Sequence, residues 1–523
     1  YMSPEQTGRM NRTIDYRSDF YSLGVTFYEI ITGKKPFYAN DPIELVHCHI
    51  ARTPPKPSDI NPDIPEVISD LIMKLLAKKA EDRYQSTYGL KYDLEKCLEL
   101  LELNGQIEYF VLGTHDIREQ FEIPEKLYGR EEQLNLLMSA YKNVCQDKKE
   151  ILLISGYSGI GKTSLVNEIH KPIAKEGGYF ISGKFDQFNR NIPYASLTQA
   201  FQQLVRQILT ESEEKIESFK NKILNVLGTN TIIMTEVIPE LKLLVGKQAP
   251  VPDLPPVEAQ NRFNSVLQNF VRVFTNNKQP LVIFLDDLQW ADPASLKFIN
   301  FLMANQEISS FLIIGAYRDN EVNTTHPLSL LIDKMTKEEI KIEDIVLKPL
   351  HFSDLKELIG DTLNNKTDKI IPLVELVFDK TGGNPFFINE FLKTIYQEQK
   401  LHFNFDKGIW EFNIEEIKAM EITDNVVKLL AQKINKFSAS NINILKMAAC
   451  IGNTFELETI SIISEQSIAE TAHALWESIK EGFIIPLGSS YRFIFNNDND
   501  DSFLNANTEA ILFKFSHDRV QQA

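Results

Sequence analysis

The chain has 523 residues, of which 43% are hydrophobic and 24% charged, and its net charge is −17. This length suits three or four domains, and the negative charge argues against a general binder of nucleic acids or anionic membranes, which would carry clustered Lys and Arg. Four cysteines without a CxxC pair exclude a zinc ribbon and indicate a reduced, cytoplasmic setting. No uncharged apolar run reaches the roughly 18 residues that a membrane span needs.

The first part of the chain, residues 1–103, predicts a mainly helical domain. An apolar stretch, Phe20–Thr32, is followed by Gly33, a residue common just after a helix. Glu66–Ala80 carries apolar residues at helical spacing on one face and predicts a second helix. Residues 104–126 are expected to form a linker.

Strands and helices alternate over residues 127–349. A helix is expected over Lys162–Ala174, and short apolar runs bounded by Gly or charge predict four strands. These strands are Ile151–Ser155, Tyr179–Gly183, Leu281–Asp286 and Phe311–Tyr317. The alternation predicts an α/β domain, with a parallel sheet and helices on both of its faces.

The last two segments predict smaller units. Residues 350–440 read as helical, with one hairpin near His402–Phe412. Residues 441–523 mix helices with two strand-like runs, Phe483–Leu487 and Tyr491–Phe495, and predict an incomplete winged-helix-like α+β segment. The fold class expected for the whole chain is therefore multidomain.

A phosphate-binding motif lies between the first predicted strand and the helix after it. The run from Gly156 to Thr163, GYSGIGKT, fits GxxxxGK[ST] in its strand–loop–helix context. Glycines let backbone N–H groups surround phosphate oxygens, and the helix N-terminus adds partial positive charge. Lys162 would reach the β- and γ-phosphates, and the Thr163 hydroxyl would ligate Mg²⁺. ATP and Mg²⁺ are thus the predicted ligand and cofactor, and the predicted binding residues here are Gly156, Gly159, Gly161, Lys162, Thr163 and Ser164.

Acidic residues at the end of another strand complete the predicted site. Asp286 would hold Mg²⁺, and Asp287 would orient and deprotonate the attacking water. Arg318 follows the strand Phe311–Tyr317 at the same edge of the sheet, where its guanidinium could sense the γ-phosphate. Lys162, Asp287 and Arg318 are the predicted catalytic residues. A polar turn and a surface arginine are the structural alternatives.

Two further motifs carry a family resemblance. Tyr128-Gly129-Arg130-Glu131 precedes the phosphate loop, and Thr381-Gly-Gly-Asn-Pro385-Phe386 follows the predicted sheet. Together with the phosphate loop and the acid pair, they resemble the signal-transduction ATPases with numerous domains, an AAA-related branch of the P-loop proteins. The resemblance implies that residues 350–440 form a helical lid and that Arg130 and Pro385 contact the nucleotide. From the residues alone, Gly-Gly-Asn-Pro is only a helix stop and a turn.

The N-terminal motifs resemble the C-terminal part of a Ser/Thr protein kinase domain. They are Tyr1-Met-Ser-Pro-Glu5, Asp19-Phe-Tyr-Ser-Leu-Gly24 and Glu81-Asp-Arg83. The resemblance implies a buried ion pair between Glu5 and Arg83, and it implies that Asp19 anchors the catalytic loop. The glycine loop and the HRD and DFG motifs of such kinases do not occur in this sequence. The kinase part as given is therefore not expected to transfer phosphate.

The order of these parts resembles that of bacterial multi-domain kinases of the cyanobacterial multi-sensor type. That resemblance implies a piece of a longer signalling protein, with covalently linked sensor modules, protein partners and an oligomer whose assembly could depend on nucleotide. The first hypothesis is a signalling kinase with an ATP-hydrolysing switch, and the alternative is an ATP- or ADP-gated scaffold with negligible turnover. A transcription factor is disfavoured, because residues 431–523 hold seven Lys and Arg against eleven Asp and Glu.

One C-terminal motif invites a different interpretation. Phe515-Ser-His517-Asp518-Arg519 superficially resembles the phospho-acceptor box of histidine kinases. The proline that follows in that box is missing here, so an element of the winged helix is the preferred interpretation.

Overall fold

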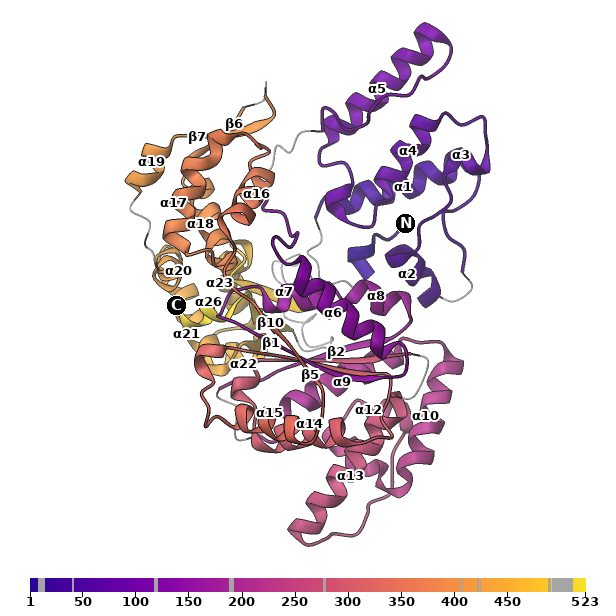
Figure 1. Cartoon of the computed structure of the whole chain (residues 1–523), viewed down its shortest axis with the longest axis vertical. Helices are drawn as coiled ribbons and strands as arrows, with labels where there is room; N and C mark the ends of the chain where they lie inside the picture. Colours follow the sequence, from indigo (N-terminus) through magenta and orange to yellow (C-terminus); the bar gives the residue numbers. More distant parts are fainter. Residues whose placement is uncertain are drawn as a thin grey trace.

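The computed structural model describes residues 1–7, 15–39, 42–116, 121–187, 192–275, 279–404, 407–420, 423, 425–487, 491 and 511–523. The protein is multidomain, with a helical N-terminal lobe, a parallel sheet flanked by helices, a helical lid and a small C-terminal part (Figure 1). In Figure 1 the N-terminal lobe and the lid lie side by side above the sheet. Among the described helices, none is long and apolar enough to cross a lipid bilayer.

The N-terminal lobe consists of helices up to residue 104 and a segment to residue 116 that returns along the last of them. Its elements are η1 (Pro4–Thr7), α1 (Arg17–Thr32), α2 (Pro42–Ala51), α3 (Pro57–Ile60), α4 (Glu66–Leu75), η2 (Ala80–Asp82) and α5 (Thr87–Asn104). The predicted end of α1 is confirmed: Gly33 adopts a φ of 67°, which glycine reaches without strain, and its N–H donates to Glu29 O. The Asp116 carboxylate accepts hydrogen bonds from the N–H groups of Gln85 and Ser86, at 2.8 and 2.9 Å. The first half of the expected linker therefore packs on this lobe.

Helix α4 ends five residues before the predicted position. The chain leaves the helix after Leu75, and the Arg83 side chain donates to the free carbonyl of Ala77 at 2.8 Å. This turn carries Arg83 into the lobe, where its side chain is fully buried. A tertiary contact thus overrides the amphipathic pattern that continues to Ala80.

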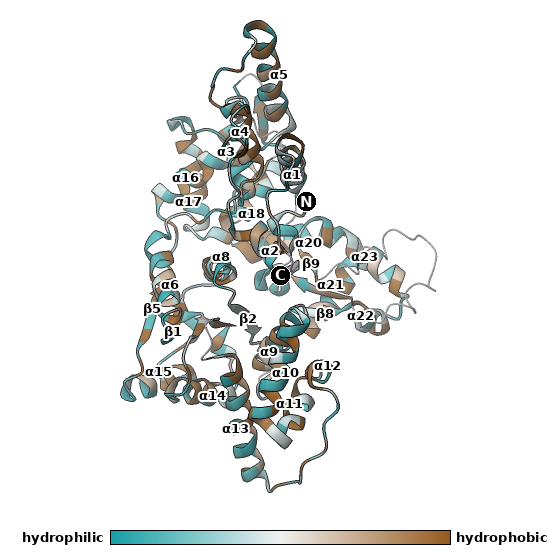
Figure 2. Ribbon diagram, turned by 90° about the vertical axis from the view of Figure 1, so that its right-hand side faces the viewer, coloured by the Kyte–Doolittle hydropathy of each residue, from teal (hydrophilic) through white to brown (hydrophobic). Residues whose placement is uncertain are grey.

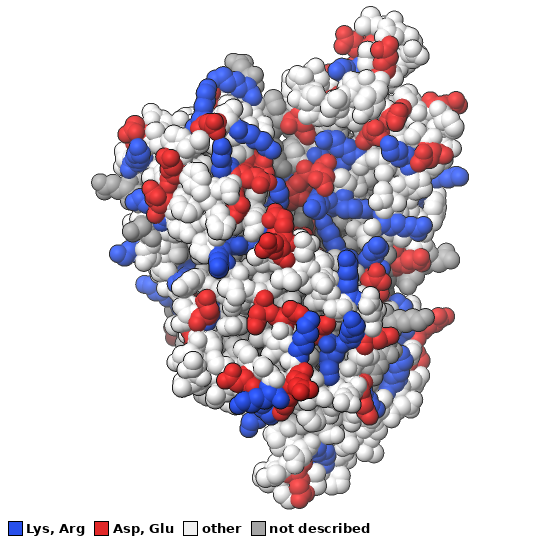
Figure 3. All heavy atoms as spheres, viewed as in Figure 1, with Lys and Arg blue, Asp and Glu red and all other residues white. Residues whose placement is uncertain are grey.

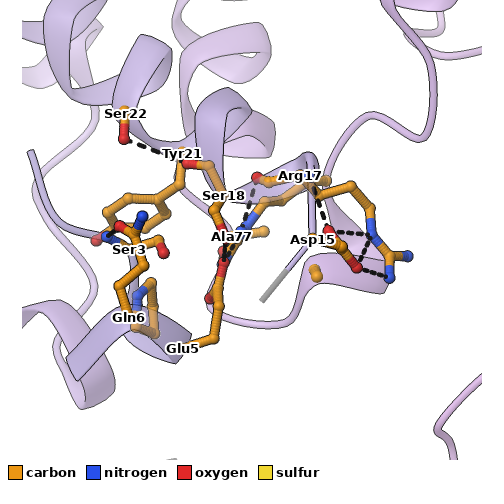
Figure 4. A network of polar contacts seen from close by, with 12 residues as sticks. Ser3, Glu5, Gln6, Asp15, Arg17, Ser18, Tyr21, Ser22 and Ala77 are labelled. Atoms are coloured by element: carbon orange, nitrogen blue, oxygen red, sulfur yellow. Dashed lines mark hydrogen bonds and ion pairs between the residues drawn. The ribbon is translucent and has the colours of Figure 1, made fainter. Parts of the chain in front are cut away.

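A buried ion pair joins η1, near the start of the chain, to the turn between η2 and α5. Arg83 donates from its two terminal nitrogens to the two carboxylate oxygens of Glu5, at 2.7 and 2.9 Å. Ser18 Oγ donates to the same carboxylate at 2.7 Å, and Figure 4 shows these two side chains reaching one another below α1. Burial alone would raise the pKa of Glu5, but the hydrogen bonds from Arg83 and Ser18 and the Arg83 charge lower it to about 2.

We expect this pair to make the N-terminal lobe sensitive to acid. Because the folded pKa of Glu5 is below its unfolded value, the contribution to stability is present above about pH 4.5 and is lost as pH falls toward 2. Glu5→Gln should lower the free energy of unfolding of the lobe by about 3 kcal/mol at pH 7 and by much less at pH 3. Hydrogen exchange of the α1 amides measures this, with the exposed Glu95→Gln as control. A difference that does not change with pH would contradict it.

The central sheet has five parallel strands in the order β2-β3-β4-β1-β5. They are β1 (Lys149–Ser155), β2 (Tyr179–Lys184), β3 (Leu281–Asp286), β4 (Phe311–Tyr317) and β5 (Ile342–Val346). The surrounding elements are α6 (Glu131–Val144), α7 (Lys162–Asn167), α8 (His170–Lys175), α9 (Ala195–Leu209), α10 (Glu213–Leu227), η3 (Gly228–Asn230), α11 (Thr231–Val237), α12 (Leu241–Val245), α13 (Pro256–Phe274), η4 (Leu288–Trp290), α14 (Pro293–Ala304), η5 (Asp319–Glu321) and α15 (Pro327–Lys337). The four predicted strands are confirmed, and the topology is that of a P-loop NTPase.

Both faces of the sheet are covered. Along β1, Ile151 and Leu153 belong to the core formed with α9, α13 and α14. Leu152 and Ile154 belong to the opposite core, formed with α6 and α7. Alternate residues of one apolar strand thus enter two cores, as expected for a parallel sheet buried on both sides.

Two features of this domain differ from the predictions. Strand β5 was not expected, because two of the five residues in its sequence, Ile-Glu-Asp-Ile-Val, are charged and only Ile345 is buried in this edge strand. The helix expected over Lys162–Ala174 is two helices that separate at Glu168 and Ile169. Pro172 explains the break, since it has no N–H for the Glu168 carbonyl and its ring would clash there.

The lid and the C-terminal part follow the sheet. The lid contains α16 (Phe352–Thr362), η6 (Asp368–Ile370), α17 (Ile371–Thr381), α18 (Pro385–Gln397), β6 (Leu401–Asn404), β7 (Ile409–Phe412), α19 (Ile414–Ala419) and α20 (Val426–Ile434). The C-terminal part contains α21 (Ala439–Ile451), β8 (Thr454–Glu456), α22 (Leu457–Ser464), α23 (Ile468–Lys480), β9 (Ile484–Leu487), β10 (Leu512–Phe515) and α26 (Asp518–Gln522). The hairpin predicted near His402–Phe412 is confirmed as β6 and β7.

The C-terminal elements have the order of a winged helix. Among the described residues, α21, α22 and α23 alternate with the strands of an antiparallel sheet in the order β8-β10-β9, α26 follows β10, and the sheet and helices share one apolar core. The strand predicted over Tyr491–Phe495 lies outside the described residues, except for Tyr491. Figure 2 shows this part standing beside the sheet domain, near α9.

Candidate nucleotide site

The carboxyl ends of the parallel strands bring the predicted site together. The phosphate loop follows β1, Asp286 and Asp287 come at the end of β3, and Arg318 follows β4. Because β4 lies between β1 and β3, these residues share one edge of the sheet, the usual place for a ligand in α/β proteins. Lys184, at the end of the neighbouring β2, joins them.

The phosphate loop requires glycine at two of its positions. Gly156 has a φ of 148°, and a Cβ there would lie 2.7 Å from Leu347 O. Gly159 has a φ of 78°, and a Cβ there would lie 2.8 Å from the Cβ of Phe386 in the lid. The loop therefore packs tightly against its surroundings, and any side chain at these positions would displace it.

Lys162 lies inside the curve of this loop. Its Nζ donates to Gly156 O at 2.7 Å and to Tyr157 O at 3.1 Å, and the side chain is buried. Burial lowers the pKa of Lys162, while the Asp286 and Asp287 charges act in the opposite direction. A buried ammonium held only by carbonyls is suited to phosphate oxygens.

The residues predicted to hold Mg²⁺ lie next to each other. Thr163 Oγ1 is 3.4 Å from Asp286 Oδ2, and both Thr163 and Ser164 are exposed at the start of α7. One hydroxyl and one carboxylate fit Mg²⁺, which takes few protein ligands and completes its shell with phosphates and water. The described ranges contain no group of three or more His, Cys, Asp or Glu side chains that could hold a metal ion. Phosphates and water would therefore have to supply the other ligands of Mg²⁺.

Asp287 is buried behind Asp286 in a strained backbone conformation. Its φ is 56° and its ψ is 44°, which is uncommon for a residue other than glycine. Oδ1 accepts a hydrogen bond from Gln289 Nε2 at 2.8 Å, and Lys184 Nζ lies 3.4 Å from Oδ2. Burial raises the pKa of Asp287 to about 7, with the like charges of Asp286 and Asp518 adding to the effect.

The predicted sensor, Arg318, is already paired. Its Nη2 lies 2.7 Å from Asp518 Oδ2, and its Nη1 lies 2.9 Å from Glu321 Oε1. The guanidinium carbon is 4.8 Å from the ring centre of Trp290. The Nε is 3.5 Å from Asp287 Oδ1, so the same side chain contacts the predicted base.

Lys184, His517 and Asp518 are residues of the site that the sequence did not predict as such. Asp518 begins α26 and forms ion pairs with both Lys184 and Arg318, which are 334 and 200 residues away in the chain. Burial works against its charged form, but these cations and His517 outweigh it and lower the pKa of Asp518. The His517 ring stacks on Phe386, with centres 3.9 Å apart and an angle of 16° between the planes. Lys184 could have been found from its position at the end of a parallel strand, whereas no local signal pointed to the Asp518 contacts.

The lid also reaches the phosphate loop. Asn384 Nδ2 donates to Ser158 O at 3.0 Å, and Phe386 N donates to Gly159 O at 3.1 Å. Pro385, between them, is the first residue of α18. The Gly-Gly-Asn-Pro segment is thus a helix start that is hydrogen-bonded to the loop, and its contact with a nucleotide stays a prediction.

Arg130 and Asp19 occupy other positions than those of direct ligands. Arg130 is buried and donates from Nη2 to Lys348 O at 2.6 Å and, more weakly, to Ile160 O at 3.4 Å. It therefore braces the phosphate loop against the strand-to-lid connection. Asp19 lies exposed in the first turn of α1. Their predicted roles, nucleotide contact and catalytic-loop anchoring, stay predictions.

The sheet order, the phosphate loop and the paired acids are those of a P-loop NTPase fold, and residues 126–314 match the AAA ATPase domain. Residues 1–94 match the protein kinase domain, so the N-terminal lobe is called the kinase lobe below. The chain thus joins part of a kinase domain to an AAA-type ATPase module.

Relatives match over most of the chain. It is 34% identical over 568 residues to hybrid signal transduction histidine kinase G of Dictyostelium discoideum, covering 93% of the chain and 16% of the relative. It is 23% identical to the peroxide stress-activated histidine kinase mak3 of Schizosaccharomyces pombe, covering 95% of the chain and 24% of the relative. The serine/threonine-protein kinase PknB of Mycolicibacterium smegmatis is 38% identical over 99 residues, covering 19% of the chain and 16% of PknB. The chain therefore spans a quarter or less of these relatives.

Among solved structures, a signal-transduction ATPase with a tetratricopeptide repeat sensor from Pyrococcus horikoshii is similar, with a TM-score of 0.36 and 14% identity over 77% of this chain and 42% of that one. A TM-score this low supports no argument about function. The relatives that match nearly the whole chain are histidine kinases of eukaryotes, so the bacterial source and the Ser/Thr type expected for the whole protein stay predictions.

Proposed function

We propose that this chain is the ATP-dependent switch of a signalling protein kinase, in which a bound nucleotide sets the arrangement of the lid and the C-terminal part relative to the sheet. The observation that carries the proposal is the meeting of three parts at one edge of the sheet. The phosphate loop, the start of α18 and the start of α26 are in direct contact there. A nucleotide in this place would touch parts of the chain that are far apart in sequence, which gives it different affinities for different arrangements.

Within this proposal, each predicted site residue has a role. The loop N–H groups and Lys162 bind the phosphates, with Arg130 and Pro385 completing the nucleotide site. Thr163 and Asp286 would hold Mg²⁺, whose charge neutralises the phosphates. Asp287 orients the attacking water and takes its proton.

The C-terminal helix α26 holds the site in a resting arrangement. While Asp518 pairs with Arg318 and Lys184, Arg318 is unable to turn to a γ-phosphate, and Lys184 is shared between two carboxylates. We call these Asp518 contacts the latch. Turnover then requires that the latch open, so that hydrolysis is slow until another event favours the open arrangement.

The alternative function is a nucleotide-gated scaffold with negligible turnover. One observation favours it: the latch occupies Arg318, and the same arginine lies 3.5 Å from Asp287, so both side chains that hydrolysis would use are already in contact with other groups. Both functions use the same nucleotide site, and they differ in the rate of ATP hydrolysis. In both, the partners are signalling proteins and sensor modules of the same polypeptide in the cytoplasm, and assembly into oligomers could follow the nucleotide state.

Nucleic acid is not among the proposed partners. On the face seen in Figure 3, acidic and basic side chains are interspersed over the lid, the kinase lobe and the sheet domain. A net charge of −17 would repel backbone phosphates.

Replacing Lys162 with Ala tests the nucleotide site. We expect the affinity for Mg·ATP to fall by at least about 100-fold, because the main point charge on the phosphates is lost, as for other strong charge-assisted hydrogen bonds. Isothermal titration calorimetry measures it, with the exposed Lys148→Ala as the matched control. Equal affinities in the Lys162→Ala and control variants would reject the site.

A further inference from the structure

A short segment before the sheet domain is anchored in the lid. Phe121 stacks on Tyr396, with ring centres 4.6 Å apart and planes 13° apart, and meets Trp410 edge to face at 5.7 Å. Ile123 packs against the same apolar core. We call residues Phe121–Ile123 the strap, because their side chains fasten the chain to the lid although the lid begins more than 200 residues later.

The residue between these two anchors points to the kinase lobe. Glu122 forms an ion pair with Arg17, the first residue of α1. The Arg17 side chain is only 4% exposed, and it also binds Asp15 at 2.6 Å and Gln85 Oε1 at 2.8 Å. Asp15 stays paired with Arg17 when Glu122 is displaced, so the strap contributes a second carboxylate to a buried cation, and losing it removes one of two compensating charges.

From Arg17 the contacts continue to the buried ion pair of the kinase lobe. The Arg17 carbonyl accepts a hydrogen bond from Arg83 Nη1 at 2.9 Å, and Arg83 binds Glu5. Ser18, the next residue of α1, binds the same carboxylate. Figure 4 shows Arg17 turned toward Asp15 and Ser18 turned toward Glu5, on successive positions of one helix. A displacement of Arg17 would therefore disturb the Glu5–Arg83 pair.

The kinase lobe has a second attachment, on the sheet domain. Helix α2 packs against α8, and the two helices adjoin in Figures 1 and 2. Helix α8 follows α7, the helix that begins at the phosphate loop. The lobe is thus held at one point by the lid and at another by the sheet domain.

We propose that the strap transmits the position of the lid to the kinase lobe, so that the nucleotide state is read at the Glu5–Arg83 pair; this rests on the proposed nucleotide switch. The kinase lobe is attached both to the lid, through the strap, and to the sheet domain. When the lid moves relative to the sheet domain, at least one of these two contacts must therefore change. The coupling is reciprocal by linkage, so the state of the strap must also change the relative affinities for the two nucleotides.

The test is hydrogen exchange of the full chain with ADP and with a non-hydrolysable ATP analogue and Mg²⁺. In the unchanged chain, exchange over residues 77–85 should differ at least about threefold between the two nucleotides, together with exchange around Asn384 in the lid. In Phe121→Ala and in Glu122→Gln, the difference at 77–85 should disappear while that around Asn384 remains. Phe403→Ala is the matched control, since it removes another ring that packs on Trp410 at 5.2 Å.

Calorimetry supplies a second readout. The ratio of the affinities for ADP and the analogue should change about fivefold in the strap variants, which is the lower end of typical coupling between two sites. In the control variant this ratio should stay constant. Glu122→Gln keeps the size of the side chain, so the test does not depend on the larger Phe121→Ala change.

The outcomes separate the two proposals. The strap is not the link if, in the unchanged chain, the lid responds to the nucleotides and residues 77–85 do not. It is also not the link if both strap variants keep the response at 77–85 and the affinity ratio. In either case the proposed nucleotide switch stands. If neither region responds although both nucleotides bind, the switch fails and the strap proposal with it.

Discussion

An Asp287→Asn variant should bind Mg·ATP normally and hydrolyse it at least about 100-fold more slowly than the unchanged chain. The side chain is buried at the end of β3, beside the residues predicted to hold Mg²⁺, and the strain in its backbone is typical of a functional position. Asparagine keeps the size of the side chain and its hydrogen bond from Gln289, but it does not accept a proton from water.

A single-turnover assay with radiolabelled ATP measures this effect. Asp319→Asn is the matched control, because Asp319 is exposed at the same edge of the sheet. An equal rate in the unchanged chain and the Asp287→Asn variant would reject Asp287 as the base. If that rate also equals the hydrolysis of ATP without protein, the scaffold function would replace the enzyme.

Asp518→Asn should raise the turnover rate by about tenfold or more. The substitution removes the negative charge that pairs with Lys184 and Arg318. Both cations then lose an ion-pair partner, and the main electrostatic attraction that holds the latch closed is lost. A change of 1.4 kcal/mol in the balance between the latched and open arrangements is enough for a tenfold effect, and removing one partner of a buried pair commonly costs more.

Two measurements check this prediction. Steady-state hydrolysis gives the rate, and hydrogen exchange over residues 511–523 reports whether α26 leaves the site. Glu458→Gln, an exposed change in α22, is the control for altered charge in the same part of the chain. If Asp518→Asn hydrolyses ATP no faster than this control, the Asp518 pairs do not restrain the site.

The central elements of the site could be predicted because their signals are local. The run from β1 through the phosphate loop to α7 has a backbone that only glycine allows at fixed positions, and the spacing of these glycines is visible in the sequence. Asp286 and Asp287 were recognisable at the end of an apolar strand, because parallel strands place their carboxyl ends at one edge. Gly33 ends α1 for the same local reason, a φ of 67°.

What the sequence did not predict depends on residues that meet only in the folded chain. The edge strand β5 carries no apolar run of its own and exists by pairing with β1. Lys184, Arg318 and Asp518 form one charged cluster, although the strand-end positions of Lys184 and Arg318 say nothing of their pairing with Asp518. Their spacing along the chain carries no signal.

By itself the sequence thus determined the phosphate loop between its strand and its helix, because such a loop needs particular residues at short, fixed intervals of the backbone. Only the tertiary structure decided which distant segments meet: α26 brings Asp518 to Arg318, and the strap places Phe121 in the lid and Glu122 on Arg17. Ion pairs and ring contacts between distant segments depend on how whole domains pack, and packing is the sum of many weak contacts that no single stretch of residues encodes.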